Sequence, residues 1–179
     1  MNSEFRIRNS EFQKLVLIAL GSNLGDSRKI LLDAMARLQK LSATPILKSS
    51  LWRTSPVDCP PDSPKFLNAV VALTPLAGET PETLLAKLQA LEQEFGRQPK
   101  TIHNEPRSLD LDLIAFGTEL RLSPRLTLPH PRAHERRFVL QPLSEIAADL
   151  TLPGQIQTVA QLVANLKVSE SCEKFSSVG

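Results

Sequence analysis

Apolar residues recur with two different periods along this chain, and the order of those periods restricts the fold. Alternating or continuous apolar runs are typical of strands, whereas apolar residues three or four positions apart form one face of a helix. Strand-like runs cover residues 15–20, 46–53, 66–73 and 109–116, and helix-like stripes follow 26 and 80. The order strand, helix, strand, strand, helix, strand predicts an α+β ferredoxin-like sandwich, a mainly antiparallel sheet with helices packed on one face.

A chain of 179 residues is long enough for one domain with a substantial core. We expect that domain to span 15–166. The segment Asn-Ser-Glu-Phe occurs at 2–5 and again at 9–12, which predicts a tag-like or disordered extension over 1–14. Residues 167–179 have no apolar periodicity, so a flexible tail is expected there.

Composition excludes several classes of function. A formal net charge of +2 does not by itself indicate a nucleic-acid partner. The only cysteines, Cys59 and Cys172, cannot build a disulfide framework or a CxxC metal site. No apolar run approaches the roughly 20 residues that a membrane-spanning helix needs. We therefore expect a cytoplasmic monomer that binds small molecules, without nucleic-acid or membrane partners.

The segment Leu109-Asp110-Leu111-Asp112-Leu113 has the alternation of a strand with one polar face. Alternation places Asp110 and Asp112 on the same side of the strand, with the leucines directed into the core. Two carboxylates held close together repel each other unless a cation or strong donors offset their charge. Magnesium takes a few carboxylate oxygens and completes its shell with water and phosphate. The alternative is a solvated acidic face on a half-exposed strand.

Arginines are concentrated around this acidic pair. Arg107 lies three residues before Asp110, and Arg97 lies on the preceding polar segment. Magnesium together with arginine forks is the equipment of phosphoryl transfer, which depends mostly on positioning and charge neutralisation. The alternative, a set of solvated surface charges, is favoured for Arg121, Arg132 and Arg137.

Residues 103–114, HNEPRSLDLDLI, resemble the signature of the 6-hydroxymethyl-7,8-dihydropterin pyrophosphokinase family. Three further stretches match that family in the same order. They are 19–25, 54–56 with 66–68, and 126–130 followed by Arg136 and Phe138. The resemblance covers about 15–146. It implies an enzyme of folate biosynthesis that transfers pyrophosphate from ATP to 6-hydroxymethyl-7,8-dihydropterin and releases AMP.

The resemblance also implies roles for individual residues in binding ATP. Asp110 and Asp112 would hold two magnesium ions on the ATP phosphates, and Arg97 and Arg107 would clamp those phosphates. These four residues form the implied catalytic set. The implied ATP site comprises Gln89, Glu92, Arg97, Arg107, Leu113, Arg125, Thr127, His130 and Arg136. Without the resemblance, a glutamine and a glutamate on a helix face would be interpreted as solvated.

A second implied site binds the pterin. Its residues are Thr54, Pro56, Val57, Phe66, Asn68 and Phe138. A flat heteroaromatic ligand needs an aromatic ring on each side, and Phe66 and Phe138 would supply that sandwich. Asn68 offers both a donor and an acceptor to the pyrimidine edge. The alternative for both phenylalanines is core packing. We also expect the loops at 54–64 and 97–106 to close over the substrates.

Two other functional classes compete with this interpretation. Nucleotidyl transferases also pair a Gly-Ser with an Asp-x-Asp strand, but they keep the two elements close in sequence, whereas Gly21-Ser22 lies far before Asp110. Ferredoxin-like domains can also bind small molecules without chemistry. A simple binding module has no use for paired carboxylates framed by arginines.

Overall fold

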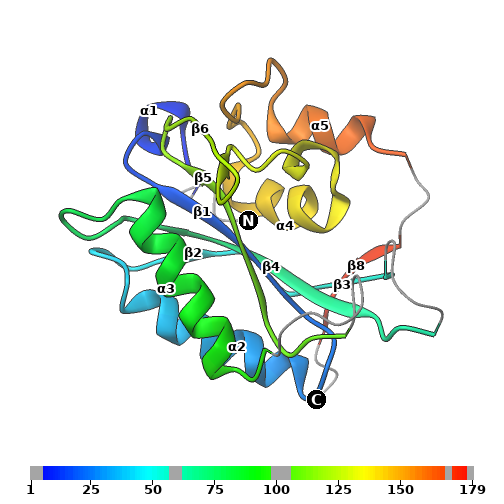
Figure 1. Cartoon of the computed structure of the whole chain (residues 1–179). Coiled ribbons are helices and arrows are strands. Elements are labelled where there is room, and N and C mark those ends of the chain that lie inside the picture. Colours follow the sequence, from blue (N-terminus) through cyan, green and yellow to red (C-terminus); the bar gives the residue numbers. More distant parts are fainter. Residues whose placement is uncertain (1–5, 57–61, 98–105, 168–170, 177–179) are drawn as a thin grey trace.

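A six-stranded sheet forms the centre of the computed structural model, which describes residues 6–56, 62–97, 106–167 and 171–176 (Figure 1). The strands lie in the order β5-β1-β4-β3-β8, and β2 also pairs with β4. Every pairing in this sheet is antiparallel. The strands are β1 (Val16–Ser22), β2 (Leu47–Lys48), β3 (Trp52–Thr54), β4 (Phe66–Leu73), β5 (Asp110–Phe116) and β8 (Cys172–Lys174).

Helices cover both faces of this sheet, not one face as the sequence pattern predicts. Helices α2 (Ser27–Gln39) and α3 (Pro81–Glu94) lie on one side, and α4 (Arg137–Ala147) and α5 (Val159–Asn165) lie on the other (Figure 1). The physical reason is the central strand β1, whose residues are all buried. A strand that is apolar on both sides needs cover on both sides.

Two apolar cores result, one on each side of the sheet. Leu111 and Leu113 of β5 belong to the core under α2 and α3. Ala19 of β1 and Val70 of β4 belong to the core under α4 and α5. Among the described residues, no helix has both the length and the apolar character required to cross a membrane.

The first two long helices begin where the sequence predicts. The Asp26 side chain accepts a hydrogen bond from the Lys29 amide at the start of α2. The Thr80 side chain does the same for Thr83 at the start of α3, with Pro81 in the first helical position. Both caps satisfy amides that have no partner inside the helix.

The region 46–53 differs from the single predicted strand. It forms β2 and β3, separated by residues 49–51, where the Ser49 hydroxyl oxygen accepts from the Val70 amide at 3.0 Å. After β5 the chain forms a small antiparallel hairpin and one 3-10 turn before α4. These elements are β6 (Arg121–Leu122), β7 (Thr127–Leu128) and η2 (Ala133–Glu135).

Both ends of the folded body extend beyond the predicted limits of 15–166. The short helix α1 (Asn9–Phe12) packs on the α4 side of the sheet, with Phe12 only 3% exposed. The Ile7 amide donates to the Ile146 carbonyl at 2.8 Å. At the other end, β8 adds a strand to the sheet. Buried Ile7 and Phe12 hold the N-terminal segment in place, and partly buried Phe175 packs against the core at the C-terminal end.

We predict that Phe12→Ala lowers the free energy of unfolding by about 3 kcal/mol, because it removes a buried ring and leaves a cavity. Urea unfolding at neutral pH measures this change. Leu122→Ala is the matched control, since Leu122 is 93% exposed and its truncation should alter stability by less than about 0.5 kcal/mol. Equal small effects of the two variants would contradict the packing of the N-terminal segment.

Candidate active site

The strand β5 places its two aspartates as its alternation predicts. Leu111 and Leu113 are buried in the core, whereas Asp110 and Asp112 are half-buried on the opposite face. Opposite them on β1 lie two residues with little or no side chain, because Gly21 pairs with Asp110 and Ala19 with Asp112. No large side chain of β1 therefore stands beside either carboxylate.

Gly21 joins the acidic pair to the next strand. It pairs with Asp110 on one side and with Asn68 of β4 on the other. A Cβ atom at position 21 would lie 3.1 Å from Asn68 Oδ1 and 3.8 Å from Phe66 Cδ1. A side chain at position 21 would therefore press on the Asn68 amide, and only glycine fits at the centre of the row that runs from Asn68 to Asp110. The implied pterin residue Asn68 and the implied metal ligand Asp110 lie on either side of Gly21.

Arg97 and Arg107 both contact the first aspartate. Each places Nη1 3.2 Å from Asp110 Oδ1. Arg97 also forms an ion pair with Glu92. The two guanidinium groups therefore converge on one carboxylate from the helix α3 side and from the segment just before β5.

Glu92 is buried, although its position on a helix face suggested a solvated side chain. It is 4% exposed, and its Oε1 accepts a hydrogen bond from the Leu111 amide at 2.7 Å. The amide of Leu111 lies on the outer edge of β5, where the described part of the sheet has no further strand. Glu92 thereby ties α3 to this edge and holds Arg97 beside Asp110.

Arg136, at the start of α4, contacts the second aspartate. Its Nη1 lies 3.9 Å from Asp112 Oδ2, and its guanidinium carbon lies 5.4 Å from the centre of the Phe138 ring. A register shift in β5 inserts one extra residue between the partners of Leu17 and Ile18. The Ile114 carbonyl in this irregular region accepts from the His130 amide at 2.8 Å. The irregularity fixes His130 next to the acidic strand.

Asp112 has a raised pKa in this site. Burial and the neighbouring Asp110 carboxylate raise the pKa of Asp112 from 3.8 to about 6, against the opposing charges of Arg136, Arg107 and Arg97. Three nearby arginines therefore do not fully offset the cost of the second carboxylate. Such a site gains stability from an additional cation.

Burial favours the neutral form of both Glu92 and His130, so it moves their pKa values in opposite directions. It raises the pKa of the Glu92 carboxyl. It lowers the pKa of His130, and the charge of Arg136 adds to that effect. The His130 Nδ1 atom accepts from the Arg132 amide at 3.2 Å, so the neutral ring carries its proton on Nε2. His130 can therefore donate a hydrogen bond from Nε2 at neutral pH.

The donor set fits magnesium shared with phosphate, and not a metal held by protein alone. Among the described residues, no group of three or more His, Cys, Asp and Glu side chains is arranged to hold a metal. Asp110 and Asp112 offer two carboxylates of the kind that magnesium binds, and magnesium takes the rest of its shell from water and phosphate. The buried Nε of Arg107 has no hydrogen-bond partner among the described residues, which leaves a donor for an anion.

The implied pterin residues lie one strand away from the acidic pair. Asn68 Nδ2 donates to Thr54 Oγ1 at 2.7 Å, and both residues are buried. Phe66 and Phe138 are half-buried, which leaves part of each ring free for a ligand. Pro56 is also half-buried. Val57, and most of the two loops predicted to close, lie outside the described residues.

The remaining implied ATP residues do not join the acidic cluster through their side chains. Gln89 and Arg125 are exposed, and Thr127 is half-buried. The Leu113 side chain lies in the core on the opposite face from the aspartates. Since β5 is an edge strand, Leu113 can offer only its main-chain groups at that edge.

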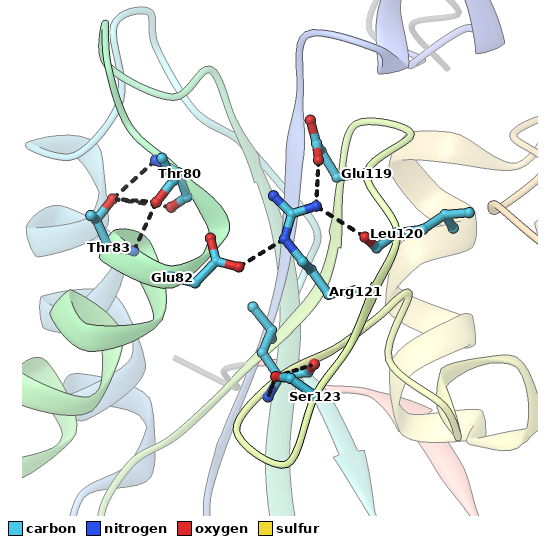
Figure 2. Close-up of polar contacts among 8 residues, drawn as sticks. Thr80, Glu82, Thr83, Glu119, Leu120, Arg121 and Ser123 are labelled. Carbon is cyan, nitrogen blue, oxygen red and sulfur yellow. Dashed lines mark hydrogen bonds and ion pairs between the residues drawn. The ribbon is translucent and has the colours of Figure 1, made fainter.

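Arg121 is a surface residue, yet it is paired and not simply solvated as predicted. Figure 2 shows it between Glu82 of α3 and Glu119, at 2.7 Å and 2.6 Å from their carboxylate oxygens. These contacts tie the β6–β7 hairpin to the N-terminal end of α3. The hairpin carries Thr127, so the pairing links two elements of the implied ATP site. Exposed pairs of this kind contribute about 1 kcal/mol or less.

Asn23 is a residue whose role sequence reasoning missed. Its Oδ1 accepts from the Arg107 main-chain amide at 2.9 Å, and the main-chain amide of Asn23 donates to the Arg107 carbonyl at 3.1 Å. Its Nδ2 donates to the Pro64 carbonyl at 3.4 Å. Asn23 thus fixes the main chain of Arg107 and the end of the loop before β4. The signal was a polar Ser22-Asn23 pair directly after a buried strand.

Comparison with known proteins gives one consistent family. The model of the family described as 7,8-dihydro-6-hydroxymethylpterin-pyrophosphokinase matches residues 17–148. The chain is 43% identical over 140 residues to the 2-amino-4-hydroxy-6-hydroxymethyldihydropteridine pyrophosphokinase of Pseudomonas aeruginosa, covering 77% of this chain and 83% of that protein. It is 41% identical over 148 residues to the protein of the same name from Haemophilus influenzae, covering 82% of this chain and 89% of that protein.

Some similar proteins are much longer. A folic acid synthesis protein of Pneumocystis carinii is 40% identical over 152 residues, covering 85% of this chain but only 20% of that protein. A crystal structure of wild-type Plasmodium falciparum HPPK-DHPS superposes with a TM-score of 0.62 at 12% identity. The superposition covers 84% of this chain and 40% of that one. This structural likeness supports the ferredoxin-like α+β fold.

We predict that Asp112→Asn stabilises the protein in the absence of magnesium. The pKa of Asp112 is raised from 3.8 to about 6, so its ionised form destabilises the folded state above pH 6. This cost fades as the pH falls through 6 towards 3.8. Because the side chain is 33% exposed, the expected gain in unfolding free energy is about 1 kcal/mol near pH 7.5, and smaller near pH 5.

Urea unfolding at the two pH values measures this gain. The exposed Asp33 of α2 provides the control, and Asp33→Asn should change stability by less than about 0.5 kcal/mol at either pH. Destabilisation by Asp112→Asn, or a gain that grows as the pH falls, would contradict the assigned cost.

Proposed function

This chain belongs to the 7,8-dihydro-6-hydroxymethylpterin-pyrophosphokinase family, and we propose that it catalyses that family's reaction in folate synthesis. The reaction transfers pyrophosphate from ATP to 6-hydroxymethyl-7,8-dihydropterin and yields AMP. Support comes from the two bacterial pyrophosphokinases of which the chain covers more than four fifths.

One observation supports this proposal most strongly. The row from Asn68 through Gly21 to Asp110 crosses three adjacent strands, and glycine puts no side chain between the Asn68 amide and the Asp110 carboxylate. A base-like ring bound at Asn68 therefore has its substituent directed along the row towards Asp110. Neighbouring strands lie about 4.8 Å apart, so Asn68 and Asp110, two strands apart, are separated by roughly 10 Å, which suits a hydroxymethyl group plus a phosphate.

Asp110 and Asp112 would hold two magnesium ions together with the ATP phosphates. Magnesium bound there would neutralise phosphate charge and lower the pKa of the pterin hydroxyl. The raised pKa of Asp112 supports this assignment, because it reports two carboxylates whose repulsion lacks full compensation. No third acidic residue is needed, since phosphate oxygens supply further ligands.

Arginine and histidine side chains bind and orient the triphosphate. Arg97 and Arg107 approach from one end of the acidic strand, and Arg136 approaches from the other. His130 adds a neutral Nε2 donor beside Arg136. Gln89, Glu92, Leu113, Arg125 and Thr127 line the nucleotide site, Leu113 through its main chain.

Thr54, Pro56, Val57, Phe66, Asn68 and Phe138 bind the pterin. With both substrates bound, the pterin hydroxyl oxygen attacks the β-phosphorus of ATP. The bond from that phosphorus to the oxygen shared with the α-phosphate breaks, AMP leaves with that oxygen, and the hydroxyl proton passes to solvent. Positioned positive charge on the phosphates is the main contribution of the protein.

The enzyme acts as a monomer in the cytoplasm under this proposal. Apart from Leu120 and Leu122 at the β6–β7 hairpin, the exposed large apolar side chains among the described residues come from separate segments and include Leu24, Leu76 and Ile156. Scattered exposed apolar residues are normal for a monomer and need no partner. The two cysteines do not provide a disulfide framework of the kind that secreted domains use.

Purified protein should form AMP from ATP when hydroxymethyldihydropterin and magnesium are both present, as measured by chromatography of the nucleotides. Asp112→Ala should lower the rate by about a thousandfold, because it removes a ligand that acts on the transferred group. Asp33→Ala is the control and should keep full activity. Removal of magnesium by a chelator should also stop the reaction.

The products separate this proposal from its rivals. Release of ADP would indicate transfer of a single phosphoryl group, and release of free pyrophosphate would indicate nucleotidyl transfer. Pterin binding without any nucleotide product would indicate a binding module. Each of these results contradicts the proposed reaction.

A further inference from the structure

The C-terminal strand β8 lies against the strand that carries Thr54. Figure 1 shows β8 beside β3 at the side of the sheet away from β5. The register pairs Thr54 with Cys172, Arg53 with Glu173 and Trp52 with Lys174. β3 is only three residues long, so β8 supplies half of its strand neighbours.

Main-chain hydrogen bonds continue this pairing beyond both ends of the two strands. The Ser55 amide donates to the Ser171 carbonyl at 3.2 Å, and the Phe175 amide donates to the Leu51 carbonyl at 2.8 Å. Hydrogen-bonded pairs alternate with non-bonded pairs in an antiparallel ladder. Arg53 and Glu173, midway between these two contacts, therefore form the next hydrogen-bonded pair.

Side chains anchor β8 to the body of the protein as well. Lys174 Nζ lies 2.8 Å from Glu145 Oε1 of α4. The other oxygen of Glu145 accepts from the Ser50 amide at 2.7 Å and from Trp52 Nε1 at 3.2 Å. The Arg53 guanidinium lies 5.0 Å from the centre of the Phe175 ring. These contacts hold β3 and β8 as one unit against α4.

Thr54 connects this unit to the pterin residues. It pairs with Cys172 of β8 on one side and with Phe66 of β4 on the other. Its Oγ1 accepts from Asn68 Nδ2, which directs the Asn68 carbonyl oxygen towards Gly21. A one-residue slip of β3 would turn Thr54 to the opposite face and remove this acceptor.

We propose that β8 is a positioning element of the pterin site. It holds β3 in the register that places Thr54 Oγ1 against Asn68 Nδ2, and so fixes which edge of the Asn68 amide meets the pterin. An amide with its NH2 group committed to Thr54 presents its oxygen to a donor on the ligand. This inference rests on the proposed pterin binding, and it assigns a role to a segment outside the residues proposed to bind either substrate.

Two variants at Glu173 separate the effect of its main-chain hydrogen bond to β3 from the effect of its side chain. Glu173→Pro removes the amide that donates in the ladder, whereas Glu173→Ala keeps it. Both variants lose the exposed contact between Glu173 and Arg53, which measures 3.7 Å. We expect Glu173→Pro to raise KM for the pterin by about tenfold and to leave KM for ATP within about twofold, because one well-placed hydrogen bond is affected. Glu173→Ala should match wild type for both substrates.

A second measurement uses the unmodified protein and does not depend on the folding of a variant. Coupling between two sites is reciprocal, so pterin binding should in turn stabilise β8. Hydrogen–deuterium exchange of a peptide covering 171–176 should slow by about tenfold with bound pterin. A non-hydrolysable ATP analogue alone should leave that exchange unchanged.

Equal effects of Glu173→Pro on the two substrates, or no effect on either, would overturn the positioning role. Exchange over 171–176 that ignores the pterin would also overturn it. Wild-type protein that forms no AMP from ATP and pterin would instead refute the proposed reaction. The two failures are therefore distinct.

Discussion

Repulsion between two carboxylates governs the architecture around the site. Asp110 and Asp112 lie on the same half-buried face of β5, and the pKa of Asp112 is raised to about 6 although three arginines lie nearby. The two negative charges destabilise the protein without ligand and favour the binding of a ligand that brings cations. Arg97, Arg107 and Arg136 lower this cost without removing it.

The position of β5 explains how those groups reach the aspartates. At the edge of the described part of the sheet, β5 is approached from the α3 side by Glu92 and Arg97, and from the segment that leads into α4 by His130 and Arg136. A central strand would have its edge amides paired with another strand. The amide of Leu111 instead donates to Glu92. The same Glu92 side chain therefore binds both the edge of β5 and Arg97.

Predictions from the sequence succeeded where the deciding property is local. The acidic alternation, the starts of α2 and α3, and the strands around 15–20, 66–73 and 109–116 follow from the spacing of neighbouring residues. The predicted single strand at 46–53 was wrong because Ser49 interrupts it with a bond to β4. The N-terminal repeat hid two residues, Ile7 and Phe12, whose burial depends on contact with the distant α4 segment.

The amino-acid sequence by itself determined which residues share a face of β5 and which arginines surround them in the chain, since strand periodicity is a property of the backbone. Only the tertiary structure decided that Asn68 lies across Gly21 from Asp110, that Asn23 holds Arg107, and that β8 supports Thr54. Those pairings join segments far apart in the chain. Strand order and register set them, and both depend on how the whole apolar core closes.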